Sequence, residues 1–264
     1  MSDAAGRADR GTSAEAERAE VPQRRAEVPH RRAVHQFVPA LIPRDATGIH
    51  TLLLRDALRS VGWRSEIFAE ATHDELAGES FKIHRYPDMA AEDDVLVYQF
   101  STSSMVADFL LHRPEILVLD YHNITAPALY EPWEPATARR SAAAIEQLGR
   151  LAPRAVLGLA DSPFNEADLR AAGCARTAVV PVLVDLHRVA SGSDPFTLQR
   201  LSEAKAPGGG DWLFVGRLVP SKAQHRLVQA LWAYRRLYDP DARLHLVGSA
   251  PSRSYLLALR AYAE

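Results

Sequence analysis

The sequence is poor in the residues that disulfide and metal chemistry require. Its single cysteine, Cys174, excludes an intramolecular disulfide and a clustered cysteine metal site. We expect this residue to be a small buried side chain near a helix end. No two histidines form an H-x-x-x-H or H-E-x-x-H pattern, so a zinc hydrolase is not expected and no metal site is predicted.

An excess of charge and a long apolar run are lacking as well. The net charge of −2 gives no electrostatic reason to expect a nucleic-acid partner. No run approaches the ~18 apolar residues of a membrane span, and the N-terminus is charged, unlike a signal peptide. These absences predict a cytoplasmic protein without a transmembrane segment, whose membrane contact would be peripheral, at the inner membrane surface.

Two catalytic motifs are also missing. The sequence contains neither a G-x-S-x-G nucleophile elbow nor a Walker A loop. Their absence argues against an esterase and against a P-loop ATPase.

Residues 1–32 have almost no large apolar side chains and are rich in Ala, Arg and Glu. They include two near copies of one heptapeptide, which begin at Ala19 and Ala26. A segment of this composition buries too little surface to offset its ordering entropy, so we predict a disordered tail. The alternative is that its paired arginines contact anionic lipid or a partner.

From Ala33 to Asp185, apolar segments alternate with amphipathic helical patterns, the first of them at about Ile49 to Val61. Such alternation predicts an α/β domain with a doubly wound parallel sheet that is covered on both faces. The expected strands are Val34–Val38, Ser65–Ala69, Phe81–His84, Asp94–Phe100, Glu115–Asp120, Ala155–Ala160 and Ala178–Val184.

Residues 186–210 have the composition of a linker around one short helical patch. A second domain is predicted over residues 211–264, with strands at Trp212–Val215 and Ala242–Gly248 and a last helix from Ser252 to Glu264. A sheet averages about 5–6 strands, and this one has two. We therefore expect an incomplete Rossmann-like domain, which either is completed by something else or marks the chain as a fragment.

The strand at Trp212–Val215 leads into a candidate anion site. Gly216 and a short loop follow it, and Ser221 is a candidate N-cap that would place Lys222 in the first helical turn. A cation in the first turn is disfavoured by the helix dipole, so its presence there indicates that an anion is expected to bind. Arg217 can grip a phosphate bidentately while Lys222 acts as a point charge, which together would clamp a diphosphate. The alternative is a pair of solvated surface cations.

Ligands of open parallel sheets bind beyond the carboxyl ends of the strands, so the residues that follow the first domain's strands are candidates. After the first strand, Gly48 would let a ligand approach a helix N-terminus. Asp45 would either accept a hydrogen bond from an acceptor hydroxyl or cap the helix.

Two further loops carry candidates at the same edge. His122 and Asn123 follow the strand that ends at Asp120. His122 is either a structural hydrogen-bonding residue or a catalytic one. Ser162 and Asn165 follow the next strand and would line a cleft, although Ser162 also fits an N-cap ahead of Pro163.

The segment from Phe214 to Lys222 resembles the G-R-L-x-x-x-K segment of the retaining glycosyltransferases of family 4. This resemblance implies a two-domain GT-B fold in which Arg217 and Lys222 hold the diphosphate of a nucleotide sugar. The usual glycine after the lysine is Ala223 here, a departure that we expect a helix to tolerate.

The first domain shows three more similarities to the same family. The position of Gly48 resembles a glycine-containing loop that faces the cleft, although the double-glycine form is absent. His122 resembles the strand-end histidine that reaches the donor sugar. The loop from Ala160 to Asn165 resembles a serine-containing segment that precedes a helix.

The resemblance implies a transferase that moves a sugar, with retention, from a nucleotide-diphosphate sugar to a saccharide, lipid or other acceptor held by the N-terminal domain. Arg217 and Lys222 would neutralise the charge that develops on the leaving diphosphate, which would spare the need for a metal or another cofactor. His122 would orient a donor hydroxyl or the reacting centre.

Two other interpretations stay open. The chain fits a non-catalytic remnant that binds nucleotide or acceptor, because the E-x7-E segment and the nucleotide pocket of the full-length family have no counterpart in it. The other is a GT-B sugar-nucleotide epimerase, for which the sequence offers no suitable group of carboxylates.

Overall fold

The computed structural model describes residues 33–186, 192, 194–204 and 209–264. The predicted disordered tail, residues 1–32, lies outside the described residues, as does part of the predicted linker.

Seven strands form one parallel sheet, as the alternation of strands and helices predicts. Its order is β3-β2-β1-β4-β5-β6-β7, and all neighbouring pairs are parallel. The strands are β1 (Val34–Leu41), β2 (Ile67–Thr72), β3 (Phe81–Lys82), β4 (Val95–Phe100), β5 (Ile116–Tyr121), β6 (Leu157–Ala160) and β7 (Thr177–Val179).

Two of these strands end earlier than predicted. After Lys82 the chain enters a 3-10 helix, η2 (Ile83–Asp88), which contains Pro87. β7 ends at Val179, two residues before Pro181. Proline has no N–H to donate to a neighbouring strand, so the ladder of β7 cannot continue through Pro181.

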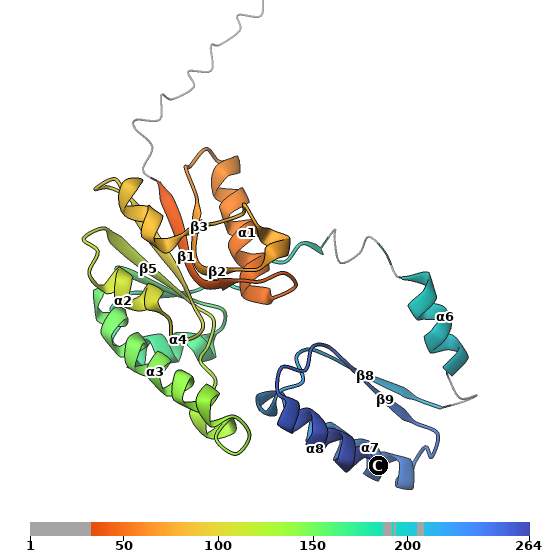
Figure 1. Ribbon diagram of the computed structural model, residues 1–264. Helices are drawn as coiled ribbons and strands as arrows, with labels where there is room; N and C mark the ends of the chain where they lie inside the picture. The colour runs from red at the N-terminus through yellow and green to blue at the C-terminus, as the bar shows by residue number, and fades with distance from the viewer. Residues whose placement is uncertain (1–32, 187–191, 193, 205–208) are drawn as a thin grey trace, which may run out of the picture. The chain divides into compact units, whose positions relative to one another are not determined.

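Four α-helices cover the two faces of this sheet, namely α1 (Ala46–Ser60), α2 (Met105–Leu111), α3 (Pro135–Leu151) and α4 (Pro163–Ala171). Crossovers between parallel strands are right-handed. The step from β1 to β2 and the steps from β4 to β7 run in opposite directions across the sheet. Accordingly α1 lies on one face, and α2, α3 and α4 lie on the other (Figure 1). Three short 3-10 helices complete the connections: η1 (Asp74–Leu76), η3 (Pro127–Leu129) and η4 (Ala152–Arg154).

Alternate residues of the central strands enter two separate apolar clusters. Phe37 and Phe68 belong to the larger cluster, which includes residues of α2, α3 and α4. Their neighbours Val38 and Ile67 belong to a smaller cluster with Leu52 of α1. Successive side chains of a strand point to opposite faces, so a buried core on each face confirms the doubly wound arrangement.

The single cysteine belongs to the larger core. Cys174 is buried just after α4, and its N–H donates to the carbonyl of Leu169. A Cβ at Gly158 of β6 would lie 2.9 Å from its sulfur, so the glycine makes room for the thiol. The prediction of a small buried residue near a helix end is confirmed.

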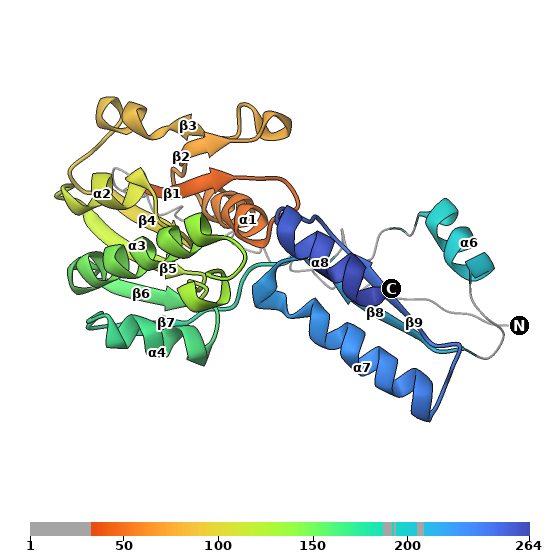
Figure 2. The same cartoon turned by 60° about the horizontal axis from the view of Figure 1, so that its bottom comes forward.

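The C-terminal part contains a second, two-stranded sheet. β8 (Asp211–Val215) and β9 (Arg243–Val247) pair in parallel. The other elements are α6 (Pro195–Ala204), within the predicted linker, and η5 (Pro220–Lys222), α7 (Gln224–Leu237) and α8 (Arg253–Ala263). Figure 2 shows α7 and α8 running beside the two strands. Of the helices described, none combines the length and the apolar character needed to cross a membrane.

Candidate functional site

The first candidate group lies at the carboxyl ends of β1, β4, β5 and β6. Asp45 follows β1 and is the N-cap of α1, because its carboxylate accepts a hydrogen bond from the Gly48 N–H at 3.3 Å. The helix therefore begins at Ala46, three residues earlier than the predicted start at Ile49. Gly48 is buried, and a Cβ there would lie 2.5 Å from the Ile42 carbonyl oxygen. Close packing of the chain on itself thus accounts for this glycine.

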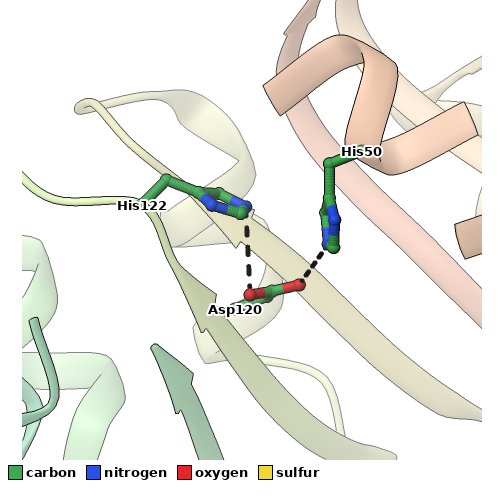
Figure 3. Close-up of side chains that lie close together, drawn as sticks. All are labelled: His50, Asp120 and His122. Atoms are coloured by element: carbon green, nitrogen blue, oxygen red, sulfur yellow. Dashed lines mark hydrogen bonds and ion pairs between the residues drawn. The ribbon is translucent and has the colours of Figure 1, made fainter. Parts of the chain in front are cut away.

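Three side chains converge behind that cap (Figure 3). His50 of α1 reaches the sheet, and its Nε2 lies 2.9 Å from Asp120 Oδ2. The other oxygen of Asp120 lies 3.9 Å from Nε2 of His122, which follows β5. All three side chains are about 4% exposed, so their charges and polar atoms interact with little solvent screening.

A chain of buried amides fixes which ring atom of His122 carries hydrogen. The Thr51 carbonyl can only accept, so Gln36 turns its Nε2 toward it, at 2.9 Å. Gln36 Oε1 then accepts from Gln99 Nε2 at 3.0 Å. That leaves Gln99 Oε1 to face His122 Nε2 at 2.6 Å, and this nitrogen must donate.

The second ring nitrogen of His122 also faces an acceptor. Its Nδ1 lies 3.1 and 3.2 Å from the two carboxylate oxygens of Asp161, which follows β6. A histidine that donates from both nitrogens is an imidazolium. The hydrogen-bond pattern therefore favours a cation at this position.

The surroundings shift the pKa of His122 in the same direction. Burial by itself lowers this pKa, because it disfavours the charged ring. The hydrogen bond with Asp161 and the negative charges of Asp120 and Asp45 outweigh burial, so the pKa is raised above its ordinary value.

His50, Asp120 and His122 have the composition of a metal site, and one potential ligand atom from each lies within 4.8 Å of the others. Their hydrogen bonds argue against that use. His50 Nδ1 accepts from the Leu183 N–H at 3.0 Å, so the neutral ring carries its hydrogen on Nε2. Because Nε2 of His122 is a donor as well, neither atom offers a lone pair to a cation.

The remaining residues predicted for this edge take different positions. Asn123 is exposed and has a φ of 69°, in the left-handed region that asparagine tolerates. Ser162 is the N-cap of α4, because its Oγ accepts from the Asn165 N–H at 3.3 Å. Asn165 is buried in the first turn of that helix. Asp45, His122 and Ser162 thus lie at the same edge of the sheet. Asp45 and Ser162 cap α1 and α4 there, and His122 follows β5.

The second candidate group follows β8. Gly216 has a φ of 152°, and Gly248, at the same end of β9, has a φ of 147°. A Cβ at Gly248 would lie 2.0 Å from the Gly216 carbonyl oxygen. The two loops therefore approach each other at a distance that only glycine permits. Gly248 closes the predicted second strand in the sequence, but it was not predicted to have this role.

The loop conformation corrects two sequence-based expectations. Ser221 and Lys222 lie in η5, and α7 begins only at Gln224, so Lys222 is not in the first turn of that helix. Ala223 precedes α7 with a φ of 54°, in the left-handed region. The position at which family 4 has glycine is therefore not helical, and alanine is strained there rather than tolerated.

Arg217 and Lys222 are both exposed on this loop. Within the part of the chain that the structure describes, neither is paired with a carboxylate. The loop is held in place by backbone and amide contacts instead: Gln224 Nε2 donates to the Arg217 carbonyl at 2.9 Å, and the Leu218 N–H donates to the Ser249 carbonyl at 2.8 Å. Both cationic heads are thus available to an anion.

Sequence reasoning missed Asp161, Gln99, Gln36 and His50 as members of the first group. Asp161 lies in the loop from Ala160 to Asn165, and its position just after a strand was an available signal. The two glutamines gave no such signal, since a polar residue in a strand ordinarily indicates a solvated face.

No protein-family model matches this chain, and no curated protein matches it either. Solved structures do match. Anabaena HepE, in complex with UDP and glucose, aligns with a TM-score of 0.55 at 17% identity over 88% of this chain and 65% of its own.

Two further structures match over a similar extent. WaaG, a glycosyltransferase involved in lipopolysaccharide biosynthesis, aligns with a TM-score of 0.57 at 12% identity over 87% of this chain and 67% of its own. α,α-Trehalose-6-phosphate synthase from Burkholderia multivorans aligns with a TM-score of 0.51 at 10% identity over 88% of this chain and 66% of its own. The chain thus spans about two thirds of the length of these proteins.

Identities this low establish the fold alone. The fold agrees with the one that the sequence predicts, an α/β architecture with a seven-stranded parallel sheet and a smaller second parallel sheet. The chain has a GT-B-like fold, the fold of the glycosyltransferases that it matches.

Proposed function

We propose that this chain is a glycosyltransferase, or the larger part of one, that moves a sugar from a nucleotide-diphosphate sugar to a saccharide, lipid or other acceptor. The observation that carries the proposal is the exposed cation pair Arg217 and Lys222, which has no carboxylate partner among the described residues. It lies on the loop after the first strand of the second sheet of a GT-B-like fold. Membership of family 4 and retention at the transferred carbon belong to the same proposal.

The two cations fit the leaving group of such a reaction. A nucleotide-sugar transfer releases a nucleoside diphosphate, whose negative charge grows as the sugar departs. An arginine offers paired N–H donors to phosphate oxygens, and a lysine offers a point charge. Together they would neutralise the diphosphate without the need for a metal ion. Gly216 leaves the backbone beside Arg217 open to a close approach by the diphosphate.

The polar edge of the seven-stranded sheet is proposed to receive sugars. Asp45, Asn123 and Ser162 would line the acceptor side there, and the buried Gly48 and Asn165 would support it from α1 and α4. His122, predicted as the catalytic residue, is proposed to act at this edge through the Asp161 carboxylate to which it donates. A cytoplasmic location, with surface contact to a membrane when the acceptor is a lipid, belongs to this proposal.

The alternative is a module that binds nucleotide or acceptor without transfer. One observation favours it: the second sheet has two strands in the residues described, fewer than an average sheet. Binding and turnover must therefore be measured separately.

Thermal melts of the whole chain with UDP-, GDP- and ADP-sugars test the binding step. A ligand at 100 times its Kd stabilises the folded state by about 2.7 kcal/mol, which raises Tm by roughly 5–10 °C for a chain of this size. We expect Arg217→Ala and Lys222→Ala each to weaken binding by about 10- to 100-fold, since each removes a charged hydrogen bond. Arg226→Ala is the matched control, because Arg226 is an exposed α7 arginine that bonds Gln229.

A cooperative melt that no nucleotide sugar shifts contradicts the proposed donor site. When a nucleotide sugar does bind, release of the nucleoside diphosphate in the presence of an acceptor distinguishes the two functions. Binding without any release supports the non-catalytic module.

A further inference from the structure

Asp161 differs from the other charged members of the polar edge in its accessibility. Its side chain is 25% exposed, whereas those of His122, Asp120 and His50 are each about 4% exposed. Gln99 and Gln36, which continue the chain of hydrogen bonds inward, are fully buried. Within this group, a ligand from solvent therefore meets the Asp161 carboxylate first.

His122 has no N–H left for a ligand. Its Nε2 donates to Gln99 and its Nδ1 donates to Asp161. The two Asp161 oxygens share the single Nδ1–H, at 3.1 and 3.2 Å, and each carboxylate oxygen has two lone pairs. Asp161 therefore keeps acceptor capacity toward solvent while its inner side is anchored.

The charge of this edge favours a neutral ligand. The charged groups around the His122 ring are Asp161, Asp120 and Asp45, and the ring of His50 packs edge-on against it at 5.3 Å. Three carboxylates against one imidazolium leave the edge net negative. Phosphate is repelled there, whereas hydroxyl groups donate well to a carboxylate.

We propose that Asp161 is a sugar-binding residue that accepts a hydrogen bond from a ligand hydroxyl, and that His122 is its positioning residue. The Thr51 carbonyl, through Gln36 and Gln99, fixes the His122 ring so that Nδ1–H always points at Asp161. The choice of a sugar as the ligand rests on the proposed function. The anchoring of Asp161 rests on geometry alone.

Long-range ¹⁵N spectra of the histidine rings in the whole chain test this assignment. We expect both His122 nitrogens to give imidazolium shifts up to a pH above its ordinary pKa. Methyl α-glucoside or methyl α-mannoside, at tens of millimolar, should move the His122 Nδ1 signal, and inorganic phosphate should not. Asp161→Asn should abolish the response to sugar and lower the His122 pKa, because it removes a negative charge and a charged acceptor from the ring.

Two controls separate this role from a general disturbance of the fold. Asp108→Asn removes an exposed carboxylate that pairs with Arg150, and it should leave the His122 signals unchanged. Gln99→Met removes the acceptor at Nε2 and should lower the His122 pKa while Asp161 stays in place. A structural role alone would not link these pKa changes to the response to sugar.

The proposal is overturned if neither sugar moves the His122 signal, if phosphate moves it more than the sugars do, or if Asp161→Asn leaves the response intact. Failure of the proposed donor site looks different. There UDP produces no stabilisation that depends on Arg217, while the response of His122 to free sugar persists.

Discussion

Ala223 carries the clearest cost at a single residue. Its φ of 54° places Cβ too close to the following carbonyl oxygen, which destabilises the folded chain by about 1–2 kcal/mol. Ala223→Gly relieves this strain, but it also gives the unfolded chain more conformational freedom, which lowers the stability of the folded chain by about 0.4–1 kcal/mol. We expect a net gain of roughly 0.5–1 kcal/mol in urea denaturation. Ala230→Gly, at an exposed position within α7, should lower stability by about 1 kcal/mol.

Equal effects of these two substitutions would contradict the left-handed conformation at Ala223. The sequence alone does not reveal this conformation, because Ser221, Lys222 and Ala223 fit a helix start as well as they fit a turn. The carbonyl of Arg217, which binds Gln224, sets the later start of α7. Tertiary contacts of this kind decide helix boundaries that local propensity leaves open.

A second histidine responds to pH in the opposite direction to His122. His35, fully buried in β1, accepts from the Glu66 N–H through Nδ1. Its Nε2 is 3.8 Å from Asp94 and has no hydrogen-bond partner among the described residues. Burial lowers its pKa more strongly than the charge of Asp94 raises it. Folding therefore favours the neutral form of His35 and the charged form of His122.

These two pKa changes predict a stability maximum near pH 6.5, the ordinary histidine value. Above it, the stabilisation from the raised pKa of His122 is lost as pH rises through the folded-state pKa. Below it, His35 takes up a proton in the unfolded chain but stays neutral in the folded chain, because its pKa is lower there. Stability therefore falls as pH drops. A tenfold difference in proton affinity between the folded and unfolded chain changes the free energy of unfolding by about 1.4 kcal/mol.

Urea denaturation across pH 5–9 checks this prediction. Asp161→Asn should flatten the alkaline side, and His35→Asn should flatten the acid side while keeping an acceptor for the Glu66 N–H. A profile whose two sides respond to the wrong substitution would contradict the assignment of either ring.

At the scale of elements, the contact between the loops after β8 and β9 sets the tightest constraint. Gly248→Ala would place a methyl group 2.0 Å from the Gly216 carbonyl oxygen, at a φ that alanine rarely adopts. We expect a loss of about 2–3 kcal/mol in the stability of the second sheet, measured by hydrogen exchange of β8 and β9.

Gly149→Ala is the control for this substitution. A Cβ at Gly149 of α3 meets no described atom within 4 Å, so alanine should be neutral or stabilising by up to about 1 kcal/mol there. A Gly248→Ala chain as stable as the parent would mean that the two loops do not approach each other in this way.

Elements were more predictable than the contacts of their side chains. Seven strands in a parallel sheet follow from apolar runs such as Asp94–Phe100 that alternate with helices, because period and length are local properties of the sequence. The hydrogen bond between Gln36 and Gln99 joins residues 63 positions apart, and the sequence of neither strand indicates which residue the glutamine will bind. The sequence therefore located the edge at which His122 lies but not the chain of amides behind it.

For the whole molecule, the two sheets differ in how well they are covered. Phe37 of β1 is fully buried, whereas Leu213 and Val215 of β8 are 69% and 71% exposed. A strand whose apolar side chains remain in water gains little from folding. We expect amides of β8 and β9 to exchange with solvent more than about tenfold faster than those of β1 and β4, by hydrogen-exchange mass spectrometry. Equal protection of both sheets would contradict this expectation.

The buried thiol beneath α4 gives the chain its own reporter. With one cysteine in the sequence, a thiol reagent has a single target, and burial raises the pKa of Cys174, which suppresses the reactive thiolate. We expect modification to require separation of α4 from β6, because the sulfur lies against Gly158 of β6, where an added Cβ would be 2.9 Å from it. Labelling kinetics thus time the opening of the seven-stranded sheet without an engineered probe.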